Sequence, residues 1–195
     1  MTDTETGILA VVAVDSHQIV ARIPVGLYPD PVAPDPDHGL VYVGNAGDGT
    51  LTVIDGSKLE VTATIPIVEG PLLGMAVDRQ LGRAYTVYLA SPLEGELAVV
   101  DIGRAEVVSR VGPVGRVDHP PSASHAVAVD EGRGRLYIAD GYGLLIVDSL
   151  NHALTASMEA ETTTYNYGLA VDPSRHRVYL LDSSTGRLLV IADQR

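Results

Sequence analysis

The chain has 195 residues, 46% of them hydrophobic, which is enough apolar material for one folded core. Thirteen basic residues stand against 25 acidic ones, and the formal net charge of -12 opposes binding to nucleic acids and to anionic membrane surfaces. Cysteine is absent, so disulfides, thiolate zinc sites and cysteine nucleophiles are excluded.

The N-terminal stretch starts with acidic residues and contains a short apolar run, from Ile8 to Val14. A signal peptide begins with basic residues, and a membrane span needs a much longer apolar run. We therefore expect a cytoplasmic protein without a membrane segment.

Two short apolar runs come first, at residues 7–15 and 18–25. After them an aspartate closes an apolar run and a tyrosine follows seven positions later, and this pair recurs along the chain. Such self-similarity indicates a repeat architecture. The four pairs are Asp35 with Tyr42, Asp78 with Tyr85, Asp130 with Tyr137, and Asp172 with Tyr179, spaced by 43, 52 and 42 residues.

Each repeat contains up to four short apolar or alternating runs that end at Gly, Asp, Asn or Pro, a pattern that predicts strands joined by tight turns. Four strands in a unit of this length indicate a β-propeller blade, with strands A to D running from the axis outward. We expect the repeated tyrosine to pack and hydrogen-bond within the fold. The aspartate after strand A is expected to form an Asx-type turn.

A more specific resemblance lies in residues 23–55, which read IPVGLYPDPVAPDPDHGLVYVGNAGDGTLTVID. This segment is similar to the YVTN-repeat family of β-propellers through residues 23–26, Tyr42, Val43, Asn45 and residues 49–55, and the later repeats match more loosely. The resemblance implies an all-β propeller of four-stranded antiparallel blades over nearly the whole chain. It implies no single function, because such propellers serve enzymes, binding modules and surface proteins alike.

We expect one propeller domain over residues 1–195 with about four blades. Strands A and B from the C-terminus and C and D from the N-terminus would complete one blade, leaving one C strand over. Three arrangements are open: closure by one chain, closure by a second copy, and a piece of a larger propeller. The predicted segments are closing strands C and D in 1–27, blade 1 in 28–68, blade 2 in 69–114, blade 3 in 115–162, and strands A to C of blade 4 in 163–195.

In a propeller the B–C and D–A connections lie on one side, which we name the decorated face. Five further tyrosines and both insertions, at 88–96 and 112–125, fall there. Long polar loops on a repetitive scaffold are the usual place for binding or catalysis. The expected ligand-binding set is Tyr28, Asp30, Tyr88, Asp118, Tyr142, Tyr165, Asn166 and Tyr167. Asp30 and Glu69, in D–A connections, also stand beside the candidates for chemistry described next.

Two sets on the decorated face are candidates for chemistry. His119 and His125, supported by Glu161 or Asp118, are candidates for a divalent metal site, because imidazole suits zinc, iron or copper and carboxylate suits calcium or magnesium. Alternatively, a neutral histidine beside a carboxylate is a candidate general base. A second candidate is a ring of calcium or magnesium ligands near the axis, although Asn and Asp also simply terminate strands. That ring consists of Asn45, Asp140 and Asp182, at the ends of three B strands.

Arginines gather on the opposite side, in or just after the A–B turns. They predict exposed ion pairs with the repeated aspartates, and the alternative is a docking patch for an acidic partner. The six are Arg79, Arg83, Arg133, Arg135, Arg175 and Arg177.

Two functions follow from these patterns. The first is a binding or scaffolding propeller whose decorated face holds a small molecule, a peptide or a protein partner, with a homodimer as one way to complete the ring. The second, suggested by enzymes among propellers that resemble this one, is a metal-assisted lyase or lactonase that uses the same face.

Overall fold

The computed structural model describes residues 1–91, 94–114, 125–140, 143–159, 166–182 and 185–192. These residues form strands and turns, so the fold is all-β, as predicted. No helix that could cross a membrane occurs in these ranges.

Five antiparallel sheets follow one another along the chain, and within each sheet the strands pair in chain order. Each sheet lies within one of the five predicted segments. The first sheet consists of β1 (Thr2–Asp3), β2 (Ile8–Ala13) and β3 (Gln18–Pro24). The second consists of β4 (Pro29–Asp35), β5 (Leu40–Asn45), β6 (Thr50–Asp55) and β7 (Glu60–Pro66). The third consists of β8 (Leu72–Asp78), β9 (Arg83–Ser91), β10 (Glu94–Asp101) and β11 (Glu106–Val111). The fourth consists of β12 (Ala126–Asp130), β13 (Arg135–Ala139), β14 (Gly143–Asp148) and β15 (Leu154–Glu159), and the fifth of β16 (Asn166–Asp172), β17 (Arg177–Asp182) and β18 (Arg187–Ala192).

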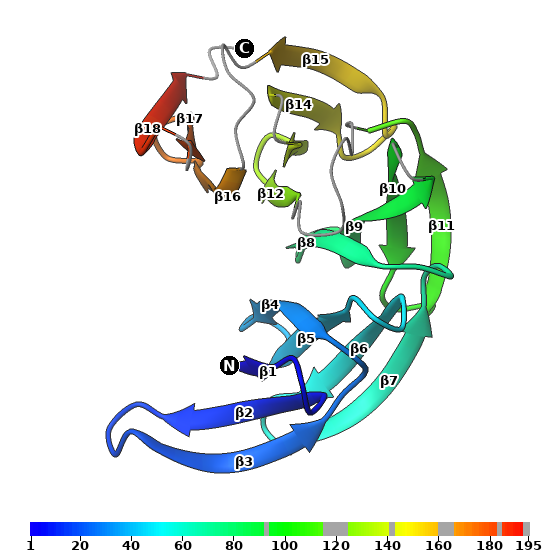
Figure 1. The fold of residues 1–195 in the computed structure, drawn as a ribbon, viewed down its shortest axis with the longest axis vertical. Helices are drawn as coiled ribbons and strands as arrows, with labels where there is room; N and C mark the ends of the chain where they lie inside the picture. Colours follow the sequence, from blue (N-terminus) through cyan, green and yellow to red (C-terminus); the bar gives the residue numbers. More distant parts are fainter. Residues whose placement is uncertain (92–93, 115–124, 141–142, 160–165, 183–184, 193–195) are drawn as a thin grey trace.

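The sheets are arranged around an open arc, with β4, β8, β12 and β16 toward its centre and β3, β7, β11 and β15 on its outer side (Figure 1). The first and fifth sheets lie at the two ends of this arc. The composite blade predicted from the first and last strands is not found among the described residues, because β1–β3 and β16–β18 pair in separate sheets. Strand β1, which the sequence did not predict, pairs with β2.

Consecutive sheets pack face to face through apolar side chains. We name the forward face of a sheet the one that packs on the next sheet in the chain, and the backward face the opposite one. On the second sheet the forward face includes Tyr42, Leu51 and Val53, which share a core cluster with Ala98 and Val100 of the third. Because β-strand side chains alternate between faces, the same register places the repeated tyrosine on the forward face of every later sheet.

The two kinds of connection lie on opposite sides, as a propeller arrangement requires. The carbonyl of Gly49, in the turn between β5 and β6, accepts hydrogen bonds from the backbone N–H groups of Ile67 and Val68, which follow β7. On the other side, the carbonyl of Gly39 accepts one from Gly56. In the second sheet, the turn between β5 and β6 and the connection after β7 therefore lie on the side that we named the decorated face, and the turns at Gly39 and Gly56 lie on the other.

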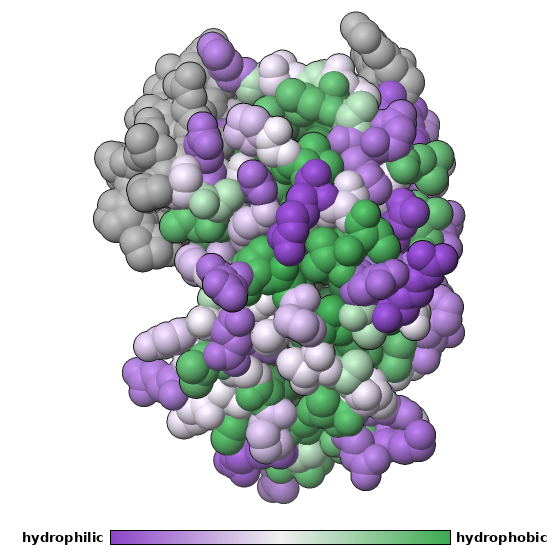
Figure 2. Space-filling view, turned by 90° about the vertical axis from the view of Figure 1, so that its right-hand side faces the viewer, coloured by the Kyte–Doolittle hydropathy of each residue, from purple (hydrophilic) through white to green (hydrophobic). Residues whose placement is uncertain are grey.

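The outer side of the arc, which includes β7 and β11, shows hydrophilic and hydrophobic residues intermixed (Figure 2). Val61 and Val108 are examples of exposed apolar residues on these outer strands. Single exposed apolar residues of this kind are ordinary for a folded protein.

The repeated aspartates have the predicted role in turns. Each accepts hydrogen bonds through Oδ1 from backbone N–H groups two or three residues later, which fixes the turn between the first two strands of its sheet. The donors are His38 for Asp35, Leu81 for Asp78, Arg133 for Asp130, and Ser174 and Arg175 for Asp172.

The Tyr42 hydroxyl is buried and donates to Asp35 Oδ2 at 3.4 Å. Burial, and secondly the Asp35 carboxylate, raise the pKa of Tyr42 to about 12.

In the unfolded chain a tyrosine titrates at pH ~10, so the contribution of the neutral Tyr42 phenol to stability is full below that pH and is lost as the pH rises toward about 12. We expect Tyr42→Phe to destabilise the protein less, relative to wild type, at pH ~11 than at pH ~8, as measured by urea unfolding. Equal differences at the two pH values would contradict the assigned environment.

Candidate ligand-binding site

A pocket of about 340 Å³ opens on the decorated face, between the second and third sheets. Its walls come from the connection after β7, the end of β9, and single residues of β10 and β11. They are Val68, Glu69, Tyr88, Leu89, Ala90, Glu96 and Arg110.

Strand register places the polar wall residues on one face. Tyr88 pairs with Glu96 across β9 and β10, and Ala98, two residues after Glu96, pairs with Arg110 of β11. Because alternate residues share a face, the side chains of Tyr88, Glu96 and Arg110 all lie on the backward face of the third sheet. They therefore point toward the second sheet and the connection after β7, which supplies Val68 and Glu69.

Hydrogen bonds and a cation–π contact fix these side chains. The Tyr88 hydroxyl donates to Glu96 Oε2. The Arg110 guanidinium lies over the Tyr88 ring, 5.4 Å from its centroid, and its Nη2 donates to the backbone carbonyl of Ile67 at 2.6 Å. Burial, and then the hydrogen bond to Glu96, raise the pKa of Tyr88, so its phenol is a neutral donor at physiological pH.

The insertion at 88–96 differs from the predicted loop. Strands β9 and β10 have nine and eight residues, whereas the equivalent β5 and β6 have six each, so most of the insertion extends the hairpin. This extension carries Ala90 and Leu89 beyond the length of the neighbouring hairpin and forms one wall of the pocket. Backbone pairing makes that wall more rigid than a free loop.

Gly112 supports the position of Glu96. A Cβ atom at Gly112 would lie 2.5 Å from Glu96 Cγ, so a larger residue would push the glutamate stem away.

The sequence predicted neither Glu96 nor Arg110 as a site residue. Glu96 and Arg110 could have been placed beside Tyr88 by aligning β9, β10 and β11 as neighbouring antiparallel strands, in which alternate side chains share a face.

Of the predicted ligand-binding residues, Tyr88 lines the pocket and is 7% exposed. Glu69, named among the candidates for chemistry, lines it as well. Tyr28 is 63% exposed and precedes β4, where Asp30 is also exposed, and neither lines the pocket. The backbones of Asn166 and Tyr167 lie in β16, and the structure does not describe their side chains. Asp118, Tyr142 and Tyr165 lie outside the described residues.

Asn45 has a structural role in the observed fold. Its amide Oδ1 accepts a hydrogen bond from the backbone of Gly26 at 3.0 Å, and its Nδ2 donates to the hydroxyls of Thr50 and Thr52 at 2.9 and 2.8 Å. The amide therefore fastens the connection after β3 to the second sheet.

The other proposed metal ligands are not seen to join Asn45. Asp140 Oδ1 accepts a hydrogen bond from Gly143 at 2.9 Å, and the side chain of Asp182 is outside the description. Within the described ranges, no group of three or more His, Asp and Glu side chains is arranged to hold a metal ion.

His125, which the sequence made a candidate metal ligand or general base, is buried. It is 2% exposed and its backbone N–H donates to Leu73 at 3.1 Å, which places it between the third and fourth sheets. The other members of that proposed set, Asp118, His119 and Glu161, lie outside the described residues.

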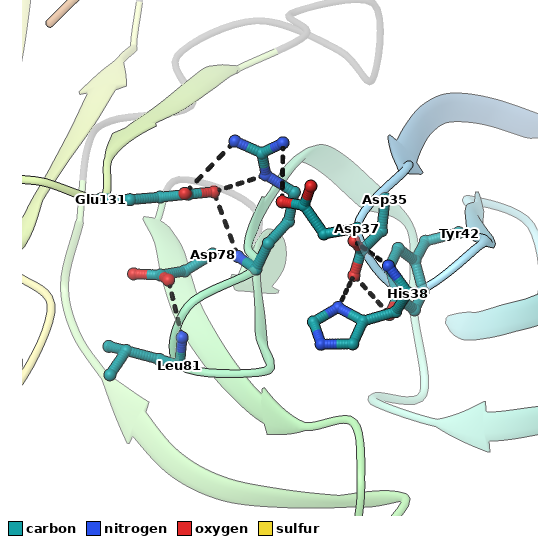
Figure 3. Close-up of polar contacts among 8 residues, drawn as sticks. Asp35, Asp37, His38, Tyr42, Asp78, Leu81 and Glu131 are labelled. Carbon is teal, nitrogen blue, oxygen red and sulfur yellow. Dashed lines mark hydrogen bonds and ion pairs between the residues drawn. The ribbon is translucent and has the colours of Figure 1, made fainter.

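On the opposite side, Arg79 contacts Glu131 and Asp37 and so links three sheets. Figure 3 labels these two carboxylates. Its Nε donates to Glu131 Oε1 at 2.8 Å, its backbone N–H donates to the same oxygen at 3.1 Å, and its Nη1 lies 3.4 Å from Asp37 Oδ2. The predicted ion pairs are therefore present for Arg79, with partners other than the repeated aspartates, and Arg175 does pair with the repeated Asp172 at 2.8 Å. These contacts join the turns of neighbouring sheets.

No family model and no curated protein matches this chain. Solved structures do match. A chain of Kuenenia stuttgartiensis hydrazine synthase is similar at a TM-score of 0.78 and 16% identity, covering 97% of this chain and 60% of that one. A chain of a mitotic checkpoint complex reaches 0.75 at 11% identity, covering 96% and 55%.

A functionally unknown protein from Desulfotomaculum acetoxidans DSM 771 is similar at a TM-score of 0.81 and 13% identity, over 100% of this chain and 61% of that chain. This chain therefore spans between 55% and 61% of the length of these matched chains. At such low identity the likeness concerns the fold alone. It supports an all-β, propeller-like fold for this chain.

Proposed function

We propose that this chain is a binding module of YVTN-type propeller architecture, whose pocket at Tyr88 takes a positively charged group of a small molecule or peptide. The observation that carries the proposal is the composition of the pocket wall. Glu69 and Glu96 contribute two carboxylates, and Arg110 contributes one cation that already contacts the Tyr88 ring and the Ile67 carbonyl.

Electrostatics favours a cation in this pocket. With two carboxylates and one guanidinium the wall has a net negative charge, and the formal charge of -12 on the whole chain adds a long-range attraction for cations. The Glu69 side chain is exposed and Glu96 is half-buried, so an ammonium group entering the pocket keeps part of its hydration. A single charged group in a partly open site supports affinities of about 0.1 to 1 mM.

We further propose that the five sheets are propeller blades and that additional sheets complete the ring. The open arc and the greater length of the matched chains support this proposal (Figure 1). The lyase or lactonase alternative gains no support here, because His125 is the only described member of its three residues and its imidazole is buried.

The binding proposal is tested with N-acetyl-lysine N-methylamide as the probe and its Nζ-acetylated form as the neutral counterpart, followed by NMR of the labelled protein. We expect the charged probe to shift the amide signals of Leu89, Ala90 and Glu69, and the neutral probe to shift them at least tenfold less at equal concentration.

The double variant Glu69→Gln with Glu96→Gln should weaken binding of the charged probe at least tenfold. A matched control, Glu60→Gln with Glu106→Gln, removes the same charge from exposed positions at the starts of β7 and β11 and should change the affinity less than about twofold. Equal losses in both double variants, or equal binding of both probes, would disprove the pocket as a cation site.

A further inference from the structure

The forward face of the fifth sheet is uncovered, although the same face is buried in the sheets before it. Leu51, Leu97 and Leu144 occupy one position in the third strands of the second, third and fourth sheets, and they are 0%, 0% and 1% exposed. Leu188 occupies that position in β18 and is 59% exposed. An apolar face that is buried in the second, third and fourth sheets and exposed in the fifth indicates a surface that packs against a neighbouring sheet.

The backward face of the first sheet is exposed at its Val12 end, whereas Ala10 on the same face is 7% exposed. Ile54, Val100 and Val147 share one position on the backward faces of the second, third and fourth sheets, and they are 1%, 0% and 0% exposed. Val12 occupies this position in β2 and is 42% exposed, and so is Ile19, its partner across β2 and β3.

The chain thus carries both halves of its own repeated interface, one at each end of the arc (Figure 1). Within the chain a forward face meets a backward face between all consecutive sheets, and Leu97 and Val147 from the third and fourth sheets share one such cluster. The two uncovered halves do not meet in the described structure, because the first and fifth sheets lie at opposite ends.

We propose that the forward face of the fifth sheet docks on the backward face of the first sheet of a second copy of this chain. The second copy is the favoured occupant because it presents a face that already fits forward faces of this type within the same molecule. The proposal is independent of the pocket at Tyr88.

A polar contact at the interface between the second and third sheets has its counterpart on the first sheet. Arg110 pairs in register with Ala98 and reaches across the interface to the Ile67 carbonyl. Arg22 pairs in the same register with Ala10. The docked first sheet therefore brings a guanidinium toward the backbone of its neighbour, as the third sheet does.

The contact is heterologous, because it joins two different faces. Each added copy leaves one face of each kind free unless the ring closes, so association grows with concentration. Because the contact joins two different faces, a variant damaged in one face can still bind a variant damaged in the other. Two such variants of an isologous contact could not restore binding in this way.

The test uses sedimentation of the full chain from about 1 to 500 µM. We expect wild type to associate, and Leu188→Glu and Val12→Glu each to associate at least 100-fold more weakly, because each variant buries a charge in the interface. An equimolar mixture should form a dimer held by one intact contact and nothing larger, because the forward face of Val12→Glu and the backward face of Leu188→Glu are intact.

Val108→Glu is the matched control, since Val108 is 39% exposed on the outer strand β11, away from both end faces, and should leave association unchanged. Circular dichroism verifies that every variant is folded. Three results would overturn the proposal: wild type that stays monomeric over the whole range, Val12→Glu that associates alone, or a mixture of folded variants that does not form a dimer.

Discussion

Gly49→Ala is expected to lower the free energy of unfolding by about 3 kcal/mol or more, measured by urea unfolding. Gly49 has a φ of +63°, in the left-handed region, and a Cβ there would lie 2.1 Å from the backbone carbonyl oxygen of Val68. That carbonyl belongs to the connection after β7, which hydrogen-bonds to Gly49 and forms part of the decorated face. The substitution therefore combines backbone strain with a clash between two backbone segments.

Gly82→Ala separates these two contributions. Gly82 has a φ of +60°, and a Cβ at this position would meet no atom within 4 Å. We expect this control to lose only about 1 kcal/mol, the usual cost of placing alanine in the left-handed region. Equal losses in Gly49→Ala and Gly82→Ala would show that the connection after β7 does not pack on the turn between β5 and β6.

Leu97→Ala is expected to lower the free energy of unfolding by about 3 kcal/mol. Leu97 is fully buried on the forward face of the third sheet, in the cluster that also contains Leu136 and Val147 of the fourth. Removing three carbons from such a site loses the transfer free energy of the side chain and leaves a cavity.

The same substitution at an equivalent but uncovered position is the control. Leu188→Ala, in β18, should change the stability of the monomer by less than about 1 kcal/mol, because this side chain is 59% exposed. Both variants are compared at a concentration where the chain is monomeric, so that docking does not contribute. Similar losses for the two leucines would contradict the assignment of Leu188 to an open end face.

Local sequence patterns predicted much of the fold. The pairing of Asp35 with Tyr42 seven residues later encodes a turn and a buried hydroxyl contact, and both are local enough to be visible in one repeat. The short alternating runs predicted nearly every strand. Strand β1 was missed because two polar residues carry no periodic signal, and they become a strand only by pairing with β2.

The site was harder to predict because its residues come together through register rather than through a motif. Tyr88 was found as a tyrosine outside the repeat, but Glu96 and Arg110 lie on adjacent strands, and only their alignment brings them to one face. His125 and Asn45 show the reverse difficulty. In a sequence, both residue types suggest a ligand or a catalytic group. In the structure the His125 imidazole is buried, and the Asn45 amide is held by hydrogen bonds with Gly26, Thr50 and Thr52.

The central claim is that each sheet buries its forward face on the next sheet and that this series ends at an open fifth sheet. A methyl NOE spectrum of the monomeric chain tests it most directly. We expect Leu97 methyl groups to show contacts with Leu136 or Val147, Leu144 to show contacts with Leu180, and Leu188 to show none with another sheet. Leu97 without contacts to the fourth sheet, or Leu188 with contacts to another sheet, would contradict the account.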